Sequence, residues 1–217
     1  MLLDEILHFF THLEKGFFNT SWSFIVRPGS TSLNYLEGQR KKYQKPFSYL
    51  LIWAGLYILL HNLVINYRGF HVSDEGFALL SQVEKANVIL RSHFTFFILP
   101  VLLYSAFVIY LVLGRPRYNF TEILTLSLYG GGTYFMMLFV SDIVLGLVFK
   151  VNTVSANVFL WQTILSSVYN FWFSYDIFKR VHLRFLIVRL ILVAILVAVI
   201  GLLMLLYLPL AWIYLKG

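Results

Sequence analysis

Four charged residues lie at the edges of long apolar stretches or inside them: Glu122, Asp142, Asp176 and Arg189. A charge buried alone in apolar surroundings is costly, so such residues pair with opposite charges or handle ions and protons. We expect Arg189 to pair with Asp176 or Glu122. Asp142 lies toward the opposite end of its apolar stretch, where Lys150 could reach it, and its carboxylate could serve a cation or proton path.

Basic residues crowd the short segment before the first long apolar stretch, at Arg40, Lys41, Lys42 and Lys45. Each basic residue near an anionic lipid surface contributes about 1 kcal/mol of attraction. Two interpretations remain open: a platform that binds lipid headgroups or a partner, and simple anchoring that fixes topology. Gly29 and Gly38 nearby favour close backbone approach, which anchoring alone does not require.

Three consecutive glycines, Gly130, Gly131 and Gly132, interrupt another apolar stretch. Each weakens a helix by about 1 kcal/mol relative to alanine. One interpretation is close packing, since small residues let helix backbones approach one another. The other is an unwound segment whose free carbonyl groups line a cavity.

The remaining candidate clusters do not form a recognisable catalytic or metal site. Glu5, His8 and His12 share one face of an amphipathic helix, but no fourth ligand accompanies them. The chain has no cysteine, and its serines form no nucleophile motif with a histidine. We therefore predict no metal, no cofactor and no catalytic residues.

The composition predicts lipid as the solvent for this chain. Of 217 residues, 59% are hydrophobic and only 12% are charged, whereas soluble domains carry about 25% charged residues. The net charge is +7. Since the basic residues cluster in short connectors, we expect the positive charge to determine membrane topology and to attract anionic lipids. We predict no binding to nucleic acid.

The hydrophobic pattern predicts an all-α, polytopic integral membrane protein with about five transmembrane helices. A helix needs roughly 20 apolar residues to cross the bilayer. The expected spans are about 47–65, 94–113, 120–148, 153–175 and 185–215.

The N-terminal segment 1–45 is predicted to form amphipathic and basic juxtamembrane helices, and residues 46–217 to form the membrane bundle. Residues 2–25 have the pattern of an amphipathic helix. Ser30 or Thr31 can cap a second helix that continues to about Tyr43. An amphipathic connector at about 68–92 is expected on the outer side.

The distribution of basic residues predicts a cytoplasmic N-terminus. With five spans, this orientation leaves only five basic residues outside: Arg68, Lys85, Arg91, Lys150 and Lys216. The short inner connectors, which include Arg115–Arg117 and Lys179–Arg184, are strongly basic. This is the positive-inside pattern of inner-membrane proteins.

One motif resembles a known family. Arg27-Pro28-Gly29 is followed by Tyr35-Leu36-Glu37-Gly38, then Arg40, Tyr43 and Pro46-Phe47. The pattern resembles a family of small bacterial membrane proteins that is known only as a domain of unknown function, and Pro100 and Glu122 fit its looser features. The resemblance implies a protein of the bacterial inner membrane and supplies no activity.

These features are compatible with three functional classes. The first is a membrane subunit that anchors or assembles with partners, either copies of itself or other proteins, together with anionic lipids. The second is a small-solute or ion transporter or channel that uses the glycine-interrupted span with Glu122 and Asp142. The third, an intramembrane enzyme acting on lipid, would need clustered acids and histidines, which the sequence does not indicate.

Overall fold

The computed structural model describes residues 16–68, 94–115, 117–151, 156–181, 184–199 and 203. Every regular element in these ranges is helical, which confirms the all-α class for the described part of the chain. Two helices are long and apolar enough to cross a membrane, Arg40–Val64 and Phe120–Val148, and they coincide with two of the expected spans. Shorter apolar helices cover Leu99–Gly114 and Leu186–Val199. The predicted connector and the Glu5–His12 face lie outside the described residues.

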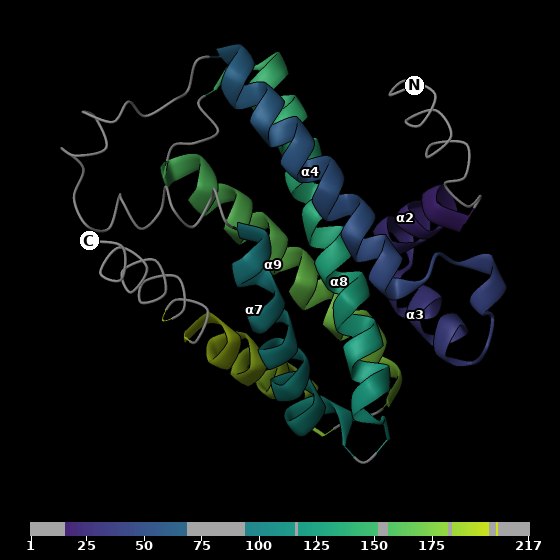
Figure 1. Ribbon diagram of the computed structural model, residues 1–217. Coiled ribbons are helices and arrows are strands. Elements are labelled where there is room, and N and C mark those ends of the chain that lie inside the picture. The colour runs from purple at the N-terminus through teal and green to yellow at the C-terminus, as the bar shows by residue number, and fades with distance from the viewer. Residues whose placement is uncertain are drawn as a thin grey trace.

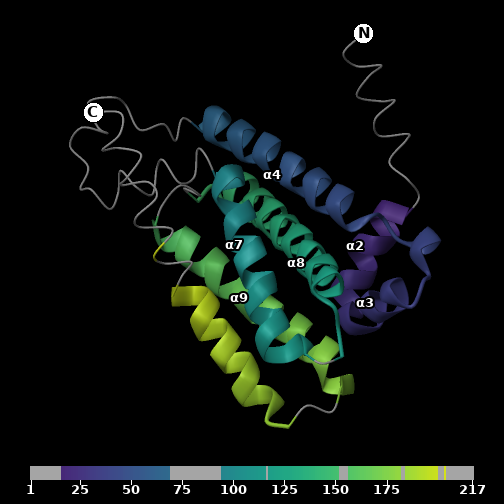
Figure 2. The ribbon, with the colours of Figure 1, turned by 60° about the horizontal axis from the view of Figure 1, so that its bottom comes forward.

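The long helices form a bundle with a smaller helical unit at one end (Figures 1 and 2). The bundle contains α4 (Pro46–Arg68), α7 (Phe94–Ile109), α8 (Phe120–Ser141) and α9 (Ala156–Phe178). Helix α8 is central, because it packs against α4, α7 and α9. The smaller unit contains α2 (Gly16–Val26), α3 (Pro28–Leu36) and the short 3₁₀ turn η1 (Arg40–Lys42). We call residues 16–45 the N-terminal unit.

Local sequence explains where several helices begin and end. Helices α3 and α4 begin at Pro28 and Pro46, since proline suits the first helical turn. The start of α8 is stabilised by Glu122, whose Oε2 accepts the backbone N–H of Asn119 at 2.8 Å. Helix α3 ends at Leu36, earlier than predicted, because Gly38 has a φ of +104° that a helix cannot continue through.

Two helices end in wider π-helical turns. Helix α7 continues into η2 (Tyr110–Gly114), and α8 continues into η3 (Asp142–Val148). In η3 the backbone N–H of Phe149 donates to the carbonyl of Val144 at 3.0 Å, five residues earlier. Such turns are rare and often occur at functional sites. The turn in η3 therefore draws attention to its first residue, Asp142.

The glycine triplet brings three helices onto α8, which remains helical throughout. A Cβ on Gly132 would collide with the Tyr49 ring of α4, and one on Gly131 would lie 2.6 Å from Leu102 of α7. A Cβ on Gly130 would lie 3.4 Å from Asn170 of α9. The triplet thus serves close packing, and the unwound segment considered as the other interpretation is not present.

An aromatic core joins the N-terminal unit to the bundle. The ring of Phe24 stacks on Tyr129 with centroids 4.5 Å apart, and its centroid lies 5.9 Å from those of Tyr49 and Phe173. All four side chains are buried. Since they come from α2, α4, α8 and α9, the core fixes the N-terminal unit against three bundle helices.

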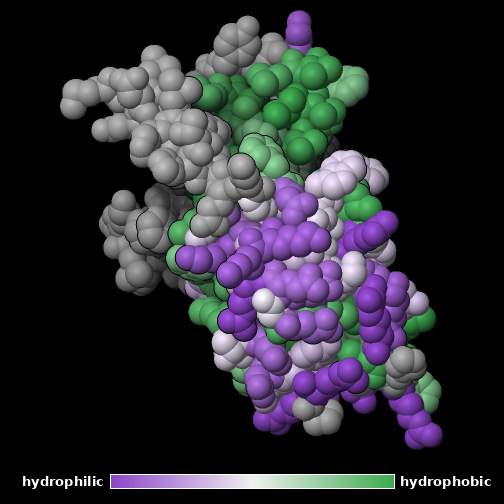
Figure 3. All heavy atoms as spheres, turned by 90° about the vertical axis from the view of Figure 1, so that its right-hand side faces the viewer, coloured by the Kyte–Doolittle hydropathy of each residue, from purple (hydrophilic) through white to green (hydrophobic). Residues whose placement is uncertain are grey.

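The outer surfaces of the helices are apolar. On α7 and its continuation η2, the exposed large apolar residues recur every fourth position, at Leu99, Leu103, Phe107 and Leu111. The other described helices, including Leu186–Val199, also expose large apolar residues, among them Leu59, Leu63, Val148, Trp161, Leu165, Ile187, Val188 and Ile191. Figure 3 shows this contrast from the side of the N-terminal unit, where hydrophilic residues gather below a hydrophobic upper part. Soluble monomers rarely expose apolar patches of such extent.

Candidate functional site

The N-terminal unit is attached to the bundle through buried hydrogen bonds to backbone groups. The backbone N–H of Gln44 donates to Thr20 Oγ1 at 2.8 Å, and its carbonyl accepts the Tyr129 hydroxyl at 2.6 Å. The Tyr169 hydroxyl donates to the carbonyl of Phe24 at 2.8 Å. Each tyrosine reaches from a bundle helix into the N-terminal unit. The unit is therefore held in place by specific polar contacts as well as by the aromatic core.

The Pro28-Gly29 pair of the motif contacts the end of α9. The backbone N–H of Gly29 donates to Oδ2 of Asp176 at 2.6 Å, and both residues are buried. Arg27, the residue before α3, offers no side-chain cap, so the carboxylate of Asp176 satisfies this free N–H from another helix. A Cβ on Gly29 would lie 2.5 Å from the carbonyl oxygen of Asp176. Glycine is therefore required here for close approach.

Contacts outside α9 stabilise the charge of Asp176 at its position in that helix. A carboxylate in the last turn of a helix faces the negative end of that helix dipole, whereas at the start of α3 it faces a positive end. Lys179 Nζ also lies 2.5 Å from Oδ1 of Asp176. Burial alone raises the pKa of Asp176, but hydrogen bonds from Lys179 and Gly29 outweigh burial and hold the pKa below its ordinary value.

The predicted basic platform lies on the exposed surface of the N-terminal unit. Arg40, Lys41, Lys42 and Lys45 are all exposed. The guanidinium of Arg40 lies 5.9 Å from the Tyr35 ring centroid, and the Asn19 side-chain amide donates to the carbonyl of Lys42 at 3.3 Å. The platform is therefore connected to both α2 and α3.

Helix α2 has an unusual polarity beside this platform. Its buried face includes Thr20 and Ser21, whereas Phe18 and Trp22 are 66% and 67% exposed. Figures 1 and 2 both show α2 crossing the direction of α4. Phe17 and Phe24 of α2 are buried, so the helix presents large apolar groups on both faces, and its outer face suits contact with lipid or with another apolar surface.

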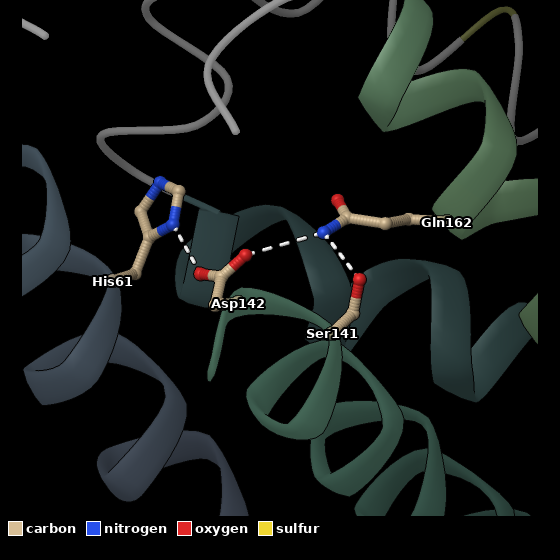
Figure 4. A network of polar contacts seen from close by, with 4 residues as sticks. All are labelled: His61, Ser141, Asp142 and Gln162. Carbon is tan, nitrogen blue, oxygen red and sulfur yellow. Dashed lines mark hydrogen bonds and ion pairs between the residues drawn. The ribbon is translucent and has the colours of Figure 1, made fainter. Parts of the chain in front are cut away.

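A second polar cluster joins three bundle helices (Figure 4). Oδ2 of Asp142 lies 2.6 Å from Nδ1 of His61, which belongs to α4. From α9, the side-chain amide of Gln162 donates to Oδ1 of Asp142 at 3.2 Å and to Ser141 Oγ at 3.0 Å. Asp142 is fully buried, and His61 is 8% exposed. We call His61, Ser141, Asp142 and Gln162 the polar cluster.

The partner of Asp142 differs from the one expected from the sequence. Lys150 is exposed, and the ionisable partner of Asp142 is His61. His61 and Gln162 were not predicted as site residues. The available signal was that both interrupt apolar stretches, but the sequence did not indicate that they face the same carboxylate.

The predicted ion pair of Arg189 with Asp176 or Glu122 is replaced by separate contacts. Arg189 Nη1 donates to the carbonyl of Val112 in the π-helical turn η2, at 3.0 Å. Asp176 pairs with Lys179, and Glu122 accepts the N–H that begins α8. Of the four predicted charges, the structure thus assigns Glu122 and Arg189 to stabilising helix ends, and places Asp142 and Asp176 in separate polar networks.

Comparison with known proteins gave one family match. No curated protein and no solved structure matches the chain. The model of the family described as "Protein of unknown function (DUF3667)" matches residues 14–58. That range contains the described N-terminal unit and the first half of α4. The match supports an uncharacterised domain family in this part of the chain.

Proposed function

We propose that the protein is a multi-pass subunit of the bacterial inner membrane that anchors or assembles with partner proteins. The partners are further copies of the chain or other proteins. The N-terminal unit lies on the cytoplasmic side and presents the basic platform to partners and anionic lipid. The observation that carries this proposal is the rigid attachment of a polar, basic unit to the end of a bundle whose outer surfaces are apolar.

The membrane setting is supported by the apolar side chains that the bundle helices turn outward. Phe107 on α7 and Leu165 on α9 are 50% and 61% exposed, and both lie among further exposed apolar residues. In water such surfaces would aggregate, whereas in lipid their exposure has no cost. Five spans remain our proposal for the whole chain.

The charge distribution supports the proposed orientation. Figure 1 shows the start of α8 and the end of α9 at the end of the bundle that carries the N-terminal unit, and most of the described basic residues belong to that unit or to the segments next to these two helix ends. Lys179 belongs to this end, because it pairs with Asp176, which accepts the backbone N–H of Gly29. Positive residues are retained on the cytoplasmic side of inner-membrane proteins.

The absence of cysteine from the sequence makes the orientation directly testable. Single-cysteine variants at Arg117 and at Lys150 probe opposite ends of the bundle, and both positions are exposed. In intact spheroplasts, a membrane-impermeant maleimide should label the variant at Lys150 and spare the one at Arg117 until the cells are opened. Labelling of Arg117→Cys from outside would refute the orientation.

The anchoring role is tested by crosslinking in cells. A photoreactive residue at Gln39, which is exposed beside the basic platform, should give discrete protein adducts. The same residue at Phe149, exposed at the opposite end, is the matched control. Replacing Arg40, Lys41 and Lys42 by glutamine should remove the Gln39 adducts. Adducts that are indistinguishable from the control would argue against a partner-binding platform.

Transport of an ion or small solute is the second candidate function. Asp142 favours it, because a carboxylate enclosed by three helices of a membrane bundle suggests a path for cations or protons. The glycine triplet does not add to this case, since α8 is continuous across it. Proteoliposomes that show no ion flux beyond protein-free vesicles would reject this candidate.

A further inference from the structure

The polar cluster contains a carboxylate that has no contact with solvent. Asp142 is 0% exposed and lies where α8 enters the π-helical turn η3. Its two oxygens are both occupied, one by His61 of α4 and the other by Gln162 of α9. The cluster goes beyond the anchoring role, because none of its residues belongs to the N-terminal unit.

Charge balance determines what this cluster can hold. The Gln162 amide supplies a hydrogen bond but no charge, so it reduces the cost of a buried carboxylate without neutralising it. The ring of Tyr57 stacks on His61 with centroids 5.3 Å apart. Among the described residues that contact the cluster, His61 is the group that can carry a compensating positive charge.

The two charge states of the pair differ by one proton. With both ring nitrogens of His61 protonated, the imidazolium and the carboxylate of Asp142 sum to zero charge. After one proton leaves, the pair carries one net negative charge in a closed environment, which is costly. The Nε2 edge of the ring points away from the carboxylate in Figure 4, so a proton can be exchanged there without breaking the 2.6 Å contact.

The backbone supports a functional interpretation of the same position. The π-helical turn begins at Asp142, and wide turns of this kind concentrate at functional sites. An ionisable residue inside a membrane bundle is also most often functional. These observations are independent, because one concerns backbone geometry and the other concerns side-chain burial.

We propose that the polar cluster is a binding site for one proton, which His61 carries and which the negative charge of Asp142 retains. The proton comes from water at the Nε2 edge of His61 and returns there. No other bond forms or breaks. The negative charge of the carboxylate favours binding of the proton, and His61 is the group that carries the proton in the native chain.

This assignment makes an unusual prediction about which residue controls proton uptake. The full chain is reconstituted in nanodiscs, and proton uptake is measured with a pH dye when the medium is shifted from alkaline to mildly acidic pH. Asp142→Asn should take up about one proton fewer than the native chain, although it retains His61, because a buried imidazolium without a counter-ion is costly. His61→Gln should retain the uptake, because the buried carboxylate then accepts the proton itself.

The controls and the infrared measurement make the outcome decisive. Lys150→Gln, which removes an exposed charge near η3, should leave proton uptake unchanged.

Infrared spectra with ¹³C-labelled aspartate should show Asp142 as a carboxylate in the native chain and as a carboxylic acid in His61→Gln. If uptake is lost in His61→Gln and retained in Asp142→Asn, the site is an ordinary histidine and the proposal is wrong. If Asp142→Asn does not fold, a carboxylate band for Asp142 in His61→Gln overturns the proposal by itself.

Discussion

Gly29 and Asp176 lie 147 positions apart, yet the backbone N–H of the first donates to the carboxylate of the second at 2.6 Å. The contact joins the motif of the N-terminal unit to the last turn of α9. The donor is a backbone N–H at the start of α3 that has no partner within that helix. The acceptor is a carboxylate at the end of α9, where the helix dipole disfavours negative charge. The hydrogen bond therefore stabilises both helix ends.

Substituting Gly29 by alanine should destabilise the fold. The added Cβ would lie 2.5 Å from the carbonyl oxygen of Asp176, an atom of a helix backbone that cannot move aside cheaply. We expect a loss of about 1–3 kcal/mol, as for other overpacked sites, measured by thermal unfolding in detergent. Gly55→Ala in α4 is the matched control, because nothing lies within 4 Å of its Cβ position. Equal effects of the two substitutions would contradict the close contact.

The charge of Asp176 should make stability depend on acidity. Its pKa is held below the ordinary value of an aspartate, so the ionised form stabilises the folded chain at neutral pH. This contribution is fully present above the ordinary aspartate pKa and is lost as the pH falls through the lower pKa of the folded state. Asp176→Asn should be less stable at neutral pH and should lose that part of the acid dependence. If the difference in stability between the native chain and Asp176→Asn is the same at every pH, the assignment is contradicted.

The three glycines of α8 should respond to alanine in a defined order. Gly132→Ala should cost most, because its Cβ would meet the Tyr49 ring and lie 3.3 Å from the backbone of Leu50. Gly131→Ala should cost less, since its nearest neighbour is the flexible end of Leu102. Gly130→Ala meets ordinary contact distances and should be nearly neutral or gain helix propensity, which is about 1 kcal/mol. Thermal unfolding of the three variants gives the order, and a reversed order would contradict the packing described.

The outward face of α2 should lie in lipid. Trp22 is 67% exposed, whereas Trp53 of α4 is 9% exposed and its indole N–H donates to Ser21. In nanodiscs, lipids with brominated chains should quench more tryptophan fluorescence in the native chain than in Trp22→Phe. The difference should be absent for Trp53→Phe, which serves as the control. If the loss of Trp22 leaves quenching unchanged, the outward face of α2 is covered by protein and does not contact lipid.

Features that depend on local sequence could be predicted, and those that depend on helix register could not. The helical class follows from apolar stretches of helical length, and the starts at Pro46 and Phe120 follow from proline and from the acidic residue Glu122. Helix α3 ends earlier than the sequence pattern predicts, because the positive φ of Gly38 outweighs the helical pattern that follows it.

The candidate sites show the same division. Asp142 and Asp176 stand out in the sequence because charges in apolar surroundings are rare. Their partners could not be identified, because His61 reaches Asp142 only in one register of α4 against α8. Likewise, the capping of α3 by Asp176 requires the end of α9 to lie against the N-terminal unit, which no local pattern specifies.

The attachment of the N-terminal unit also constrains the order in which the chain can mature. Its segment is synthesised before Tyr129, Tyr169 and Asp176, which hold it in place. The unit must therefore wait, without its final hydrogen bonds, until α9 has been made. The family match ends at residue 58, so the matched segment completes its native contacts through residues that lie beyond the match.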